Sequence, residues 1–326
     1  MKTRKLGSQG LETSAVGLGC MGMTIQYGTL DDAQSVKTIQ HALDVGVNLL
    51  NTSDAYGNGQ NEELIAGALK GRRDKAILTT KFGQVRGAHG ASVNGKPEYV
   101  VQACVASLKR LGTDYIDLYC QHRVDPDVPI EETVGAMKFL VEKGYVRYIG
   151  LSEAGANTIR RAHATHPITA LETEYSLWSR DVETEILPVC RELGIGFTAY
   201  APLGRGFLSG TIRSDADLVE GDRRREHPRF RHENMAANLR KVEMLEDVAK
   251  SLGATPAQTA LAWLLAKDPL IVPIPGTKHE NLLDENAAAA DLPITKGQIA
   301  RLDTAFAPGT TAGDRYPTAQ LSRLGL

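Results

Sequence analysis

The stretch VNLLNTSDAYG (residues 47–57) runs from a largely apolar start into a polar segment that ends in tyrosine and glycine. AILTTKF (76–82) and IDLYCQHR (116–123) are built in the same way, with a lysine and a histidine where the apolar part ends. Short, β-branched apolar runs bounded by polar residues are typical of buried strands. An amphipathic helical pattern follows each of the three, which favours parallel strands joined by helices. In such proteins ligands bind at the carboxyl ends of the strands, so we expect these three side chains at one site.

The alternation of strand and helix continues along the whole chain. Eight strand-like runs end near Gly19, Leu50, Thr80, Tyr119, Gly150, Leu171, Ala199 and Val272. Helical patterns occupy residues 32–45, 62–69, 99–111, 130–142, 157–164, 181–193, 239–252 and 281–290, with an additional one at 256–266. Several helices stop at a glycine, as at Gly112 and Gly194, where a left-handed cap ends a helix. Eight strand–helix units predict an α/β fold, a single (β/α)8 TIM barrel over residues 1–326.

Two segments interrupt this regularity. Residues 204–238, after the seventh strand, are rich in glycine, arginine and histidine and are long for a simple connection. We interpret them as a lid or cofactor clasp, with a solvated charged loop as the alternative. The C-terminal tail, residues 308–326, lacks periodicity, and we expect it to wrap the rim of the barrel.

The composition is that of a globular protein with a large core, because 42% of the 326 residues are hydrophobic. A net charge of −2 gives no reason to expect nucleic acid or an anionic membrane as a partner, and no apolar run reaches the roughly 20 residues of a bilayer span. The basic N-terminus leads into a polar turn rather than the apolar core of a secretory signal, so we expect a cytoplasmic protein. Four scattered cysteines (Cys20, Cys104, Cys120 and Cys190) lack metal-site spacing, which predicts reduced structural thiols and no bound metal.

Residues 17–22, GLGCMG, match the dinucleotide fingerprint GxGxxG. That fingerprint requires a helix that starts at its last glycine and an acidic residue about 20 residues further on, at the end of the next strand. Here residues 23–30 come before the helix, and the next strand ends at Asn51. We therefore disfavour a Rossmann fold and expect instead that the backbone at Cys20 and Met21 passes close to a ligand.

The three strand-end side chains suit the reduction of a carbonyl group. A phenol with a pKa near ~10 donates its proton poorly unless a cation stabilises the phenolate. Lys81 can supply that charge to Tyr56, and His122 can hydrogen-bond a carbonyl oxygen. Each residue has an ordinary alternative, as a turn aromatic, a barrel-mouth cation or a buried core histidine. Their arrival on consecutive strand ends favours a common site.

With these motifs the chain resembles the aldo-keto reductases, and the runs GLSE (150–153) and TEYSLW (173–178) are similar to the branch of pyridoxal and perakine reductases. The resemblance covers nearly the whole chain. It implies a barrel that binds NADPH without a Rossmann fold and reduces an aldehyde or ketone by hydride transfer. On this resemblance Tyr56 is the proton donor, Lys81 tunes it, and His122 orients the carbonyl.

The resemblance also implies a cofactor site at the ends of later strands. Ser152 would hydrogen-bond the carboxamide of the nicotinamide, and Tyr200 would stack on its ring. The remaining positions expected at the cofactor are Cys20, Met21, Glu172, Leu203, Gly204, Arg205, Gly276, Thr277, Lys278, Glu285 and Asn286. A hydroxyl and a cation at positions 277 and 278 suit a 2′-phosphate, which favours NADPH over NADH.

Three positions depart from the family's usual pattern. Asn51 stands where an aspartate usually pairs with the lysine; it can accept a hydrogen bond from Lys81 but supplies no countercharge. Glu172 replaces the usual glutamine, and we hypothesise that its carboxylate partly substitutes for the missing charge and favours the oxidised nicotinamide. Leu282 replaces an arginine, which weakens the preference for NADPH. The sequence alone predicts low turnover and a gain on Asn51→Asp.

The leading hypothesis is therefore an NADPH-dependent reductase of small carbonyl compounds. The alternative is a nicotinamide-binding regulatory or sensor barrel with weak or no turnover, which the asparagine at position 51 keeps open. A metal-dependent hydrolase would need clustered His and Asp at strand ends, and only His122 qualifies. Trp178 either walls the substrate pocket or packs in the core. The sequence predicts neither the substrate nor the oligomeric state.

Overall fold

The computed structural model describes residues 1–25, 27, 29–87 and 90–326. Eight parallel strands form one sheet, in which each strand is bonded to the next in chain order. They are β3 (Leu18–Gly19), β4 (Leu49–Asn51), β5 (Ile77–Phe82), β8 (Ile116–Gln121), β9 (Val146–Ser152), β10 (Ala170–Glu174), β11 (Gly196–Tyr200) and β12 (Ile271–Pro273). The amides of Gly17 and Gly19 donate to the carbonyls of Pro273 and Pro275 over 2.9 and 3.0 Å. These bonds join the first strand to the last, so the predicted (β/α)8 barrel and its eight strands are confirmed.

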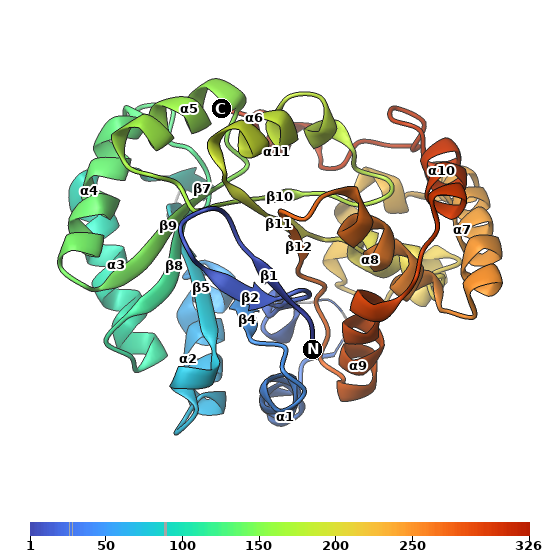
Figure 1. Cartoon of the computed structure of the whole chain (residues 1–326), viewed down its shortest axis with the longest axis horizontal. Coiled ribbons are helices and arrows are strands. Elements are labelled where there is room, and N and C mark those ends of the chain that lie inside the picture. Colours follow the sequence, from blue (N-terminus) through green and yellow to red (C-terminus); the bar gives the residue numbers. More distant parts are fainter. Residues whose placement is uncertain (26, 28, 88–89) are drawn as a thin grey trace.

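Helices surround the strands on the outside of the barrel (Figure 1). They are α1 (Asp32–Asp44), α2 (Gln60–Ala68), α3 (Pro97–Leu111), α4 (Ile130–Glu142), α5 (Ala156–Thr165), α6 (Ile186–Leu193), α7 (His232–Leu252), α8 (Pro256–Lys267) and α9 (Glu280–Ala288). The helix ends at Gly112 and Gly194 have φ of 60° and 65°, which confirms the left-handed caps predicted there. The sequence placed the start of α7 too late and that of α6 too early, because the polar turns before each helix have no clear period.

An N-terminal hairpin closes one end of the barrel. Strands β1 (Thr3–Lys5) and β2 (Glu12–Ser14) pair antiparallel, and Leu6 and Leu11 between them are buried against the barrel-interior side chains. Gly7, with φ +82°, lies so close to the barrel that a Cβ there would be 2.5 Å from the carbonyl of Thr169. The sequence analysis did not predict this cover, because three-residue strands leave little periodicity.

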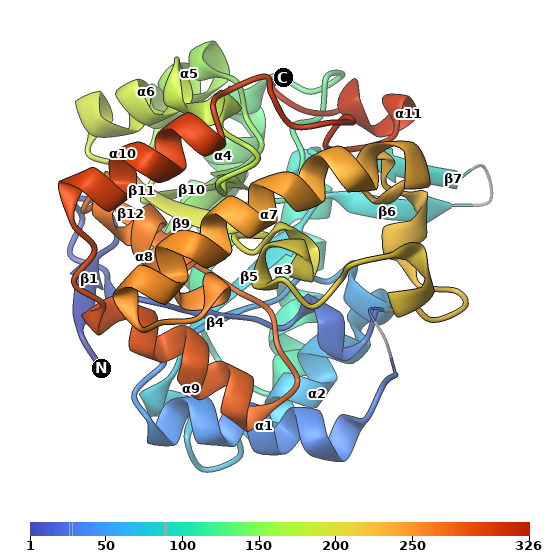
Figure 2. The same ribbon diagram turned by 90° about the vertical axis from the view of Figure 1, so that its right-hand side faces the viewer.

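The opposite end of the barrel is the mouth, where the longer connections gather (Figure 2). A second hairpin, β6 (Gln84–Gly87) with β7 (Gly90–Val93), follows β5. The segment 204–238 contains a series of 3-10 turns, η5 (Gly204–Ser209), η6 (Asp215–Asp217), η7 (Arg223–Glu226) and η8 (Pro228–Phe230), and then the start of α7. After α10 (Lys296–Ala305), which was not predicted, the tail carries the short α11 (Thr318–Leu321) over the mouth.

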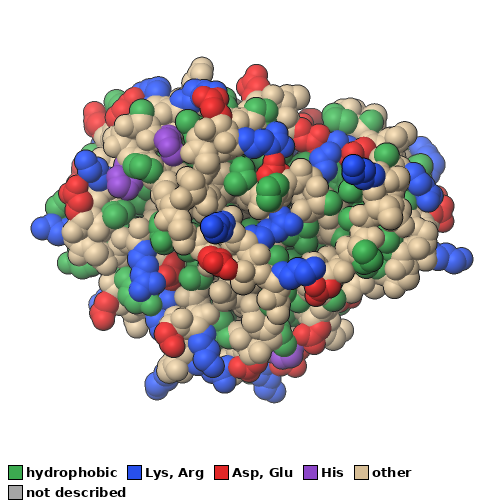
Figure 3. Space-filling view, viewed as in Figure 1, with side chains coloured by type: hydrophobic (Ala, Val, Ile, Leu, Met, Phe, Trp, Pro, Cys, Tyr) green, Lys and Arg blue, Asp and Glu red, His purple; other side chains and the backbone are tan. Residues whose placement is uncertain are grey.

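Charges of both signs are mixed on the face that the N-terminal hairpin covers (Figure 3). This mixture agrees with the small net charge of −2. No helix in the described part of the chain combines the length and the apolar character that a bilayer crossing requires.

Candidate active site

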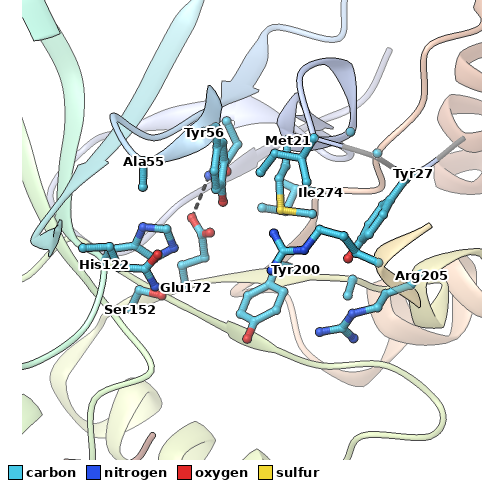
Figure 4. A pocket seen from close by; sticks show the side chains of 18 of the residues that line it. Met21, Tyr27, Ala55, Tyr56, His122, Ser152, Glu172, Tyr200, Arg205 and Ile274 are labelled. Carbon is cyan, nitrogen blue, oxygen red and sulfur yellow. Dashed lines mark hydrogen bonds between the residues drawn. The ribbon is translucent and has the colours of Figure 1, made fainter. Parts of the chain in front are cut away.

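A cavity of about 940 Å³ opens at the mouth of the barrel. It is lined by residues at or just after the carboxyl ends of the strands, together with the segment after β11 and the C-terminal tail. The lining from the strand ends includes Gly19, Met21, Asn51, Tyr56, His122, Ser152, Glu172, Tyr200 and Gly276. Figure 4 shows many of these side chains converging on the same space.

The structure brings together the three side chains on which the sequence analysis depended. Tyr56 begins the turn η2 (Tyr56–Gly59), and its ring lies edge-on to the His122 ring with centroids 5.8 Å apart. The ammonium of Lys81 lies 5.3 Å from the centroid of the Tyr56 ring. Lys81 has no exposed side-chain surface and is not part of the cavity lining, so it does not contact the cavity directly.

A closed network of three polar side chains holds Lys81 in place. Its Nζ donates to Asn51 Oδ1 over 2.6 Å and lies 3.0 Å from Glu172 Oε1. Asn51 Nδ2 donates to Glu172 Oε2 over 2.6 Å, and this bond is drawn in Figure 4. All three side chains are buried, so each hydrogen bond and the ion pair act in a medium that screens charge weakly.

Burial and neighbouring charges set the protonation states of these groups. Burial raises the pKa of Tyr56 and outweighs the opposing effect of Lys81. Burial lowers the pKa of Lys81, but Glu172 and Tyr56 more than offset it, so this pKa is above its ordinary value. Burial, Arg123 and Lys81 hold the pKa of His122 well below 6.5. At neutral pH the site therefore contains a protonated phenol, an ammonium and a neutral imidazole.

The neutral imidazole of His122 is fixed through one of its nitrogens. Ser53 Oγ lies 3.1 Å from His122 Nδ1, which leaves Nε2 as the ring nitrogen available to a ligand. The next residue, Arg123, also lines the cavity, and its Nη1 donates to Ser152 Oγ over 3.2 Å. The sequence analysis missed Arg123, although it ends one of the three informative runs.

The two residues expected around the nicotinamide both line the cavity, at the ends of two strands that flank β10. Ser152 ends β9, and Tyr200 ends β11. The Tyr200 hydroxyl donates to Glu153 Oε1 over 2.8 Å and lies 2.9 Å from the hydroxyl of Tyr316 in the tail. Tyr316 was not predicted as a site residue, because nothing in the irregular tail shows which of its residues returns to the mouth.

The segment after β11 brings cations to the cavity. Leu203 and Arg205, both expected at the cofactor, line it together with Arg224. Arg205 pairs with the buried Glu174 at 3.0 Å. Gly204 is turned toward Trp178 instead: a Cβ at this glycine would lie 2.5 Å from the indole. Of the two interpretations of Trp178, the structure supports core packing, since its side chain is buried and stacks on a neighbouring phenylalanine.

Gly276, Thr277 and Lys278, which were expected at the adenosine end of the cofactor, also line the cavity. Lys278 Nζ donates to the carbonyls of Tyr27 and Thr29 over 2.8 and 2.5 Å. Leu282 lines the cavity as well. Besides Gly204, three positions expected at the cofactor do not reach the lining in this structure. Cys20 is fully buried, Asn286 is buried in α9, and Glu285 accepts a hydrogen bond from Thr255 over 2.6 Å.

Potential metal ligands do not cluster here. Among the described residues, no group of three or more His, Cys, Asp or Glu side chains is arranged to hold a metal ion. The groups at the mouth are a phenol, an ammonium and an imidazole, and the cavity that Tyr56 and His122 line is lined by Lys278 as well.

Comparison with known proteins agrees with this geometry. The sequence model described as the aldo/keto reductase family matches residues 15–306. The chain belongs to this family. It is 48% identical over 320 residues to the probable aldo-keto reductase 1 of Glycine max, covering 96% of this chain and 91% of that protein. Aldo-keto reductases are oxidoreductases of small-molecule carbonyl compounds that use nicotinamide cofactors.

Solved structures show the same fold. An aldo-keto reductase from Bacillus halodurans, in its holo form, has a TM-score of 0.77 at 30% identity, over 94% of this chain and 96% of that chain. The glycerol dehydrogenase of Gluconobacter oxydans has a TM-score of 0.86 at 26% identity, over 94% of this chain and 95% of that chain. The barrel, with its site at the mouth, is therefore the aldo-keto reductase fold.

Proposed function

We propose that this protein reduces an aldehyde or ketone to an alcohol with NADPH as the cofactor and Tyr56 as the proton donor. The observation that carries the proposal is that Tyr56 and His122 line one cavity, with the buried ammonium of Lys81 beside the Tyr56 ring. The cofactor, when bound, supplies a hydride to the carbonyl carbon. The protein must then deliver a proton to the carbonyl oxygen.

The protonation states divide the work among the three residues. Tyr56 keeps its proton because burial raises its pKa, so the general acid is fully protonated at neutral pH. As the proton leaves, negative charge grows on the phenol oxygen, and the nearby ammonium of Lys81 stabilises it in a weakly screened site. His122 is neutral, so it donates an N–H hydrogen bond to the carbonyl oxygen but does not transfer its proton.

The rest of the cavity suits a dinucleotide. Ser152 and Tyr200 stand beside the catalytic residues and offer a hydroxyl and an aromatic ring to the nicotinamide. Arg205 and Arg224 line the same cavity and offer guanidinium groups to the pyrophosphate. Lys278 and Thr277 supply a cation and a hydroxyl for a 2′-phosphate, which supports NADPH over NADH.

The alternative of a sensor barrel rested on the missing carboxylate at position 51. The contact between Lys81 and Glu172 at 3.0 Å supports the enzyme instead, because Lys81 has a carboxylate partner after all. An ammonium with such a partner stays charged in a buried site and remains able to act on Tyr56.

The proposal is tested by fluorescence titration with NADPH and NADH, followed by a panel of aldehydes and ketones monitored at the nicotinamide absorbance. Tyr56→Phe should lower kcat by roughly 100- to 10,000-fold, the range of general acid catalysis, and leave the NADPH dissociation constant unchanged. Binding without turnover by the parent protein would favour the sensor. Absence of binding would refute both functions.

A further inference from the structure

We propose that Glu172 is the counter-ion of Lys81 and that Asn51 is the bridge that holds this ion pair together. The carboxylate that neutralises Lys81 then comes from β10, at position 172, instead of from β4, at position 51. The inference deepens the proposed function and rests on it for its catalytic consequence. Glu172 and Asn51 are positioning residues here: they act on the substrate through Lys81 and Tyr56.

The side chains of Lys81, Asn51 and Glu172 contact one another in a closed cycle, which we call the polar ring. Lys81 reaches Asn51 at 2.6 Å and Glu172 at 3.0 Å, and Asn51 reaches Glu172 at 2.6 Å. The two carboxylate oxygens of Glu172 thus each have a donor. Glu172 also lines the cavity, where its remaining lone pairs can accept the carboxamide N–H of a nicotinamide.

The chemistry of the polar ring permits a single orientation of the Asn51 amide. An ammonium has donors alone, so the group that faces it must be the carbonyl oxygen, Oδ1. An ionised carboxylate has acceptors alone, so the group that faces it must be the amide nitrogen, Nδ2. Asn51 meets both demands at once. Among side chains of its size, an amide is the one that provides an acceptor and a donor on opposite sides.

Charge counting shows why the two positions depend on each other. In the natural protein Lys81 carries +1, Glu172 carries −1 and Asn51 is neutral, so the charges of the three side chains sum to zero. Asn51→Asp brings two carboxylates to a separation of about 2.6 Å and a sum of −1, and such pairs hold a proton between them. Glu172→Gln leaves a buried ammonium with no countercharge. The double variant restores a sum of zero.

Most groups near these three side chains titrate far from neutrality, and the exception is Asp54, which lines the same cavity and has a pKa of about 7. Besides Glu172, the titratable groups that interact electrostatically with Lys81 are Tyr56, Cys20, Cys120 and His122. The phenol and both thiols have raised pKa values, and the imidazole has a lowered one. Asp54 is present in the parent as well, so an ionisation near neutral pH that appears only in Asn51→Asp would belong to the carboxylate pair.

The first experiment is a double-mutant cycle of the parent, N51D, E172Q and N51D/E172Q, assayed for kcat, KM and the pH profile of kcat. Each single variant should lose roughly tenfold or more in kcat, and the double variant should return to within about threefold of the parent. N51D should also show a new ionisation in the pH profile. This expectation reverses the one from sequence alone, in which N51D raised turnover.

The second experiment needs no turnover. Thermal stability of the four proteins without cofactor, followed against pH, should fall in both single variants and recover in the double variant. Asp117→Asn is the matched control, because Asp117 is a buried carboxylate on β8 that pairs with Arg73 at 2.7 Å and Arg147 at 3.0 Å. It should lower stability and leave kcat and its pH profile unchanged, since Asp117 lies at the start of its strand, away from the mouth.

Additive effects in both experiments would overturn the inference, as would a gain in kcat for N51D alone. A parent protein without turnover on any carbonyl would refute the proposed function, yet the stability cycle would still decide whether Glu172 and Asn51 act as one unit. Restored stability without restored kcat in the double variant would reduce the polar ring to a structural feature and overturn its catalytic role.

Discussion

Arg315 ties the C-terminal tail to the barrel by donating hydrogen bonds of 3.0 and 2.8 Å to the two carboxylate oxygens of Glu153. Glu153 directly follows Ser152 and adopts φ +54°, a backbone conformation that is uncommon outside glycine. The same carboxylate accepts the hydroxyl of Tyr200 over 2.8 Å. The tail is thereby connected to two residues that we place at the nicotinamide.

Arg315→Ala should free the tail and weaken NADPH binding. The loss of stability should stay below the roughly 3–5 kcal/mol of a fully buried pair, because the tail can detach and let water reach Glu153. Tyr200 then loses the neighbours that fix its ring, and we expect the NADPH dissociation constant to rise about tenfold. Fluorescence titration and limited proteolysis of the tail measure the two effects. Arg301→Ala, at an exposed position of α10, is the control and should change neither measurement. If Arg315→Ala keeps an intact tail and an unchanged affinity for NADPH, the prediction is contradicted.

Lys278→Ala should reduce the preference for NADPH over NADH. In this structure Lys278 is bonded to the carbonyls of Tyr27 and Thr29, and a 2′-phosphate would offer a charged acceptor in their place. A hydrogen bond to a charged group contributes about 1.5–3 kcal/mol, which corresponds to roughly 10- to 100-fold in the dissociation constant of NADPH.

Parallel titrations with both cofactors measure this preference, and raised salt should weaken NADPH more than NADH. Lys250→Ala, at an exposed position of α7, should change neither constant. An equal loss for the two cofactors would place Lys278 away from the 2′-phosphate.

The four cysteines should resist thiol reagents in the folded protein. All four are free and buried. Burial raises the pKa of Cys20, Cys104 and Cys190 to about 12 and that of Cys120 as well, so almost no reactive thiolate exists at neutral pH. A disulfide-exchange reagent should label none rapidly in the native protein and four after denaturation. Rapid labelling of one native thiol would reveal an open conformation at that site.

Much of the barrel was predictable because its signals are local. Apolar runs of the right length mark the strands, and glycines such as Gly112 mark the helix ends. Tyr56, Lys81 and His122 were singled out for a related reason, since each lies at or shortly after the end of a strand and parallel strands bring their ends together. The N-terminal hairpin has no comparable signal.

The parts of the site that were missed depend on contacts between distant segments. Arg315 and Tyr316 belong to a tail without periodicity, and no local pattern connects them to β9 or β11. The partner of Lys81 illustrates the same limit. From the sequence, Asn51 was expected to bond Lys81 and Glu172 was hypothesised to replace the missing charge, but only the closed barrel shows that Glu172 contacts the ammonium itself.

Asp54 gives the protein a stability that depends on pH near neutrality. Burial, aided by the charge of Glu62, raises the pKa of Asp54 to about 7, against an ordinary value of 3.8. Between these two values the folded protein holds a proton that the unfolded chain has released. The free energy of unfolding therefore falls as pH rises through this range, and the loss is complete above about pH 7.

Asp54→Asn should remove this dependence, because an amide needs no proton to remain neutral. The variant should match the parent in Tm near pH 4 and exceed it increasingly up to pH 8. Calorimetry at several pH values measures the difference, with Asp247→Asn, at an exposed position of α7, as the control that should follow the parent. A Tm difference that stays constant with pH, or that shrinks as pH rises, would mean that the Asp54 carboxyl is already ionised in the folded protein at low pH, held by a cation such as Arg110 rather than kept neutral by burial.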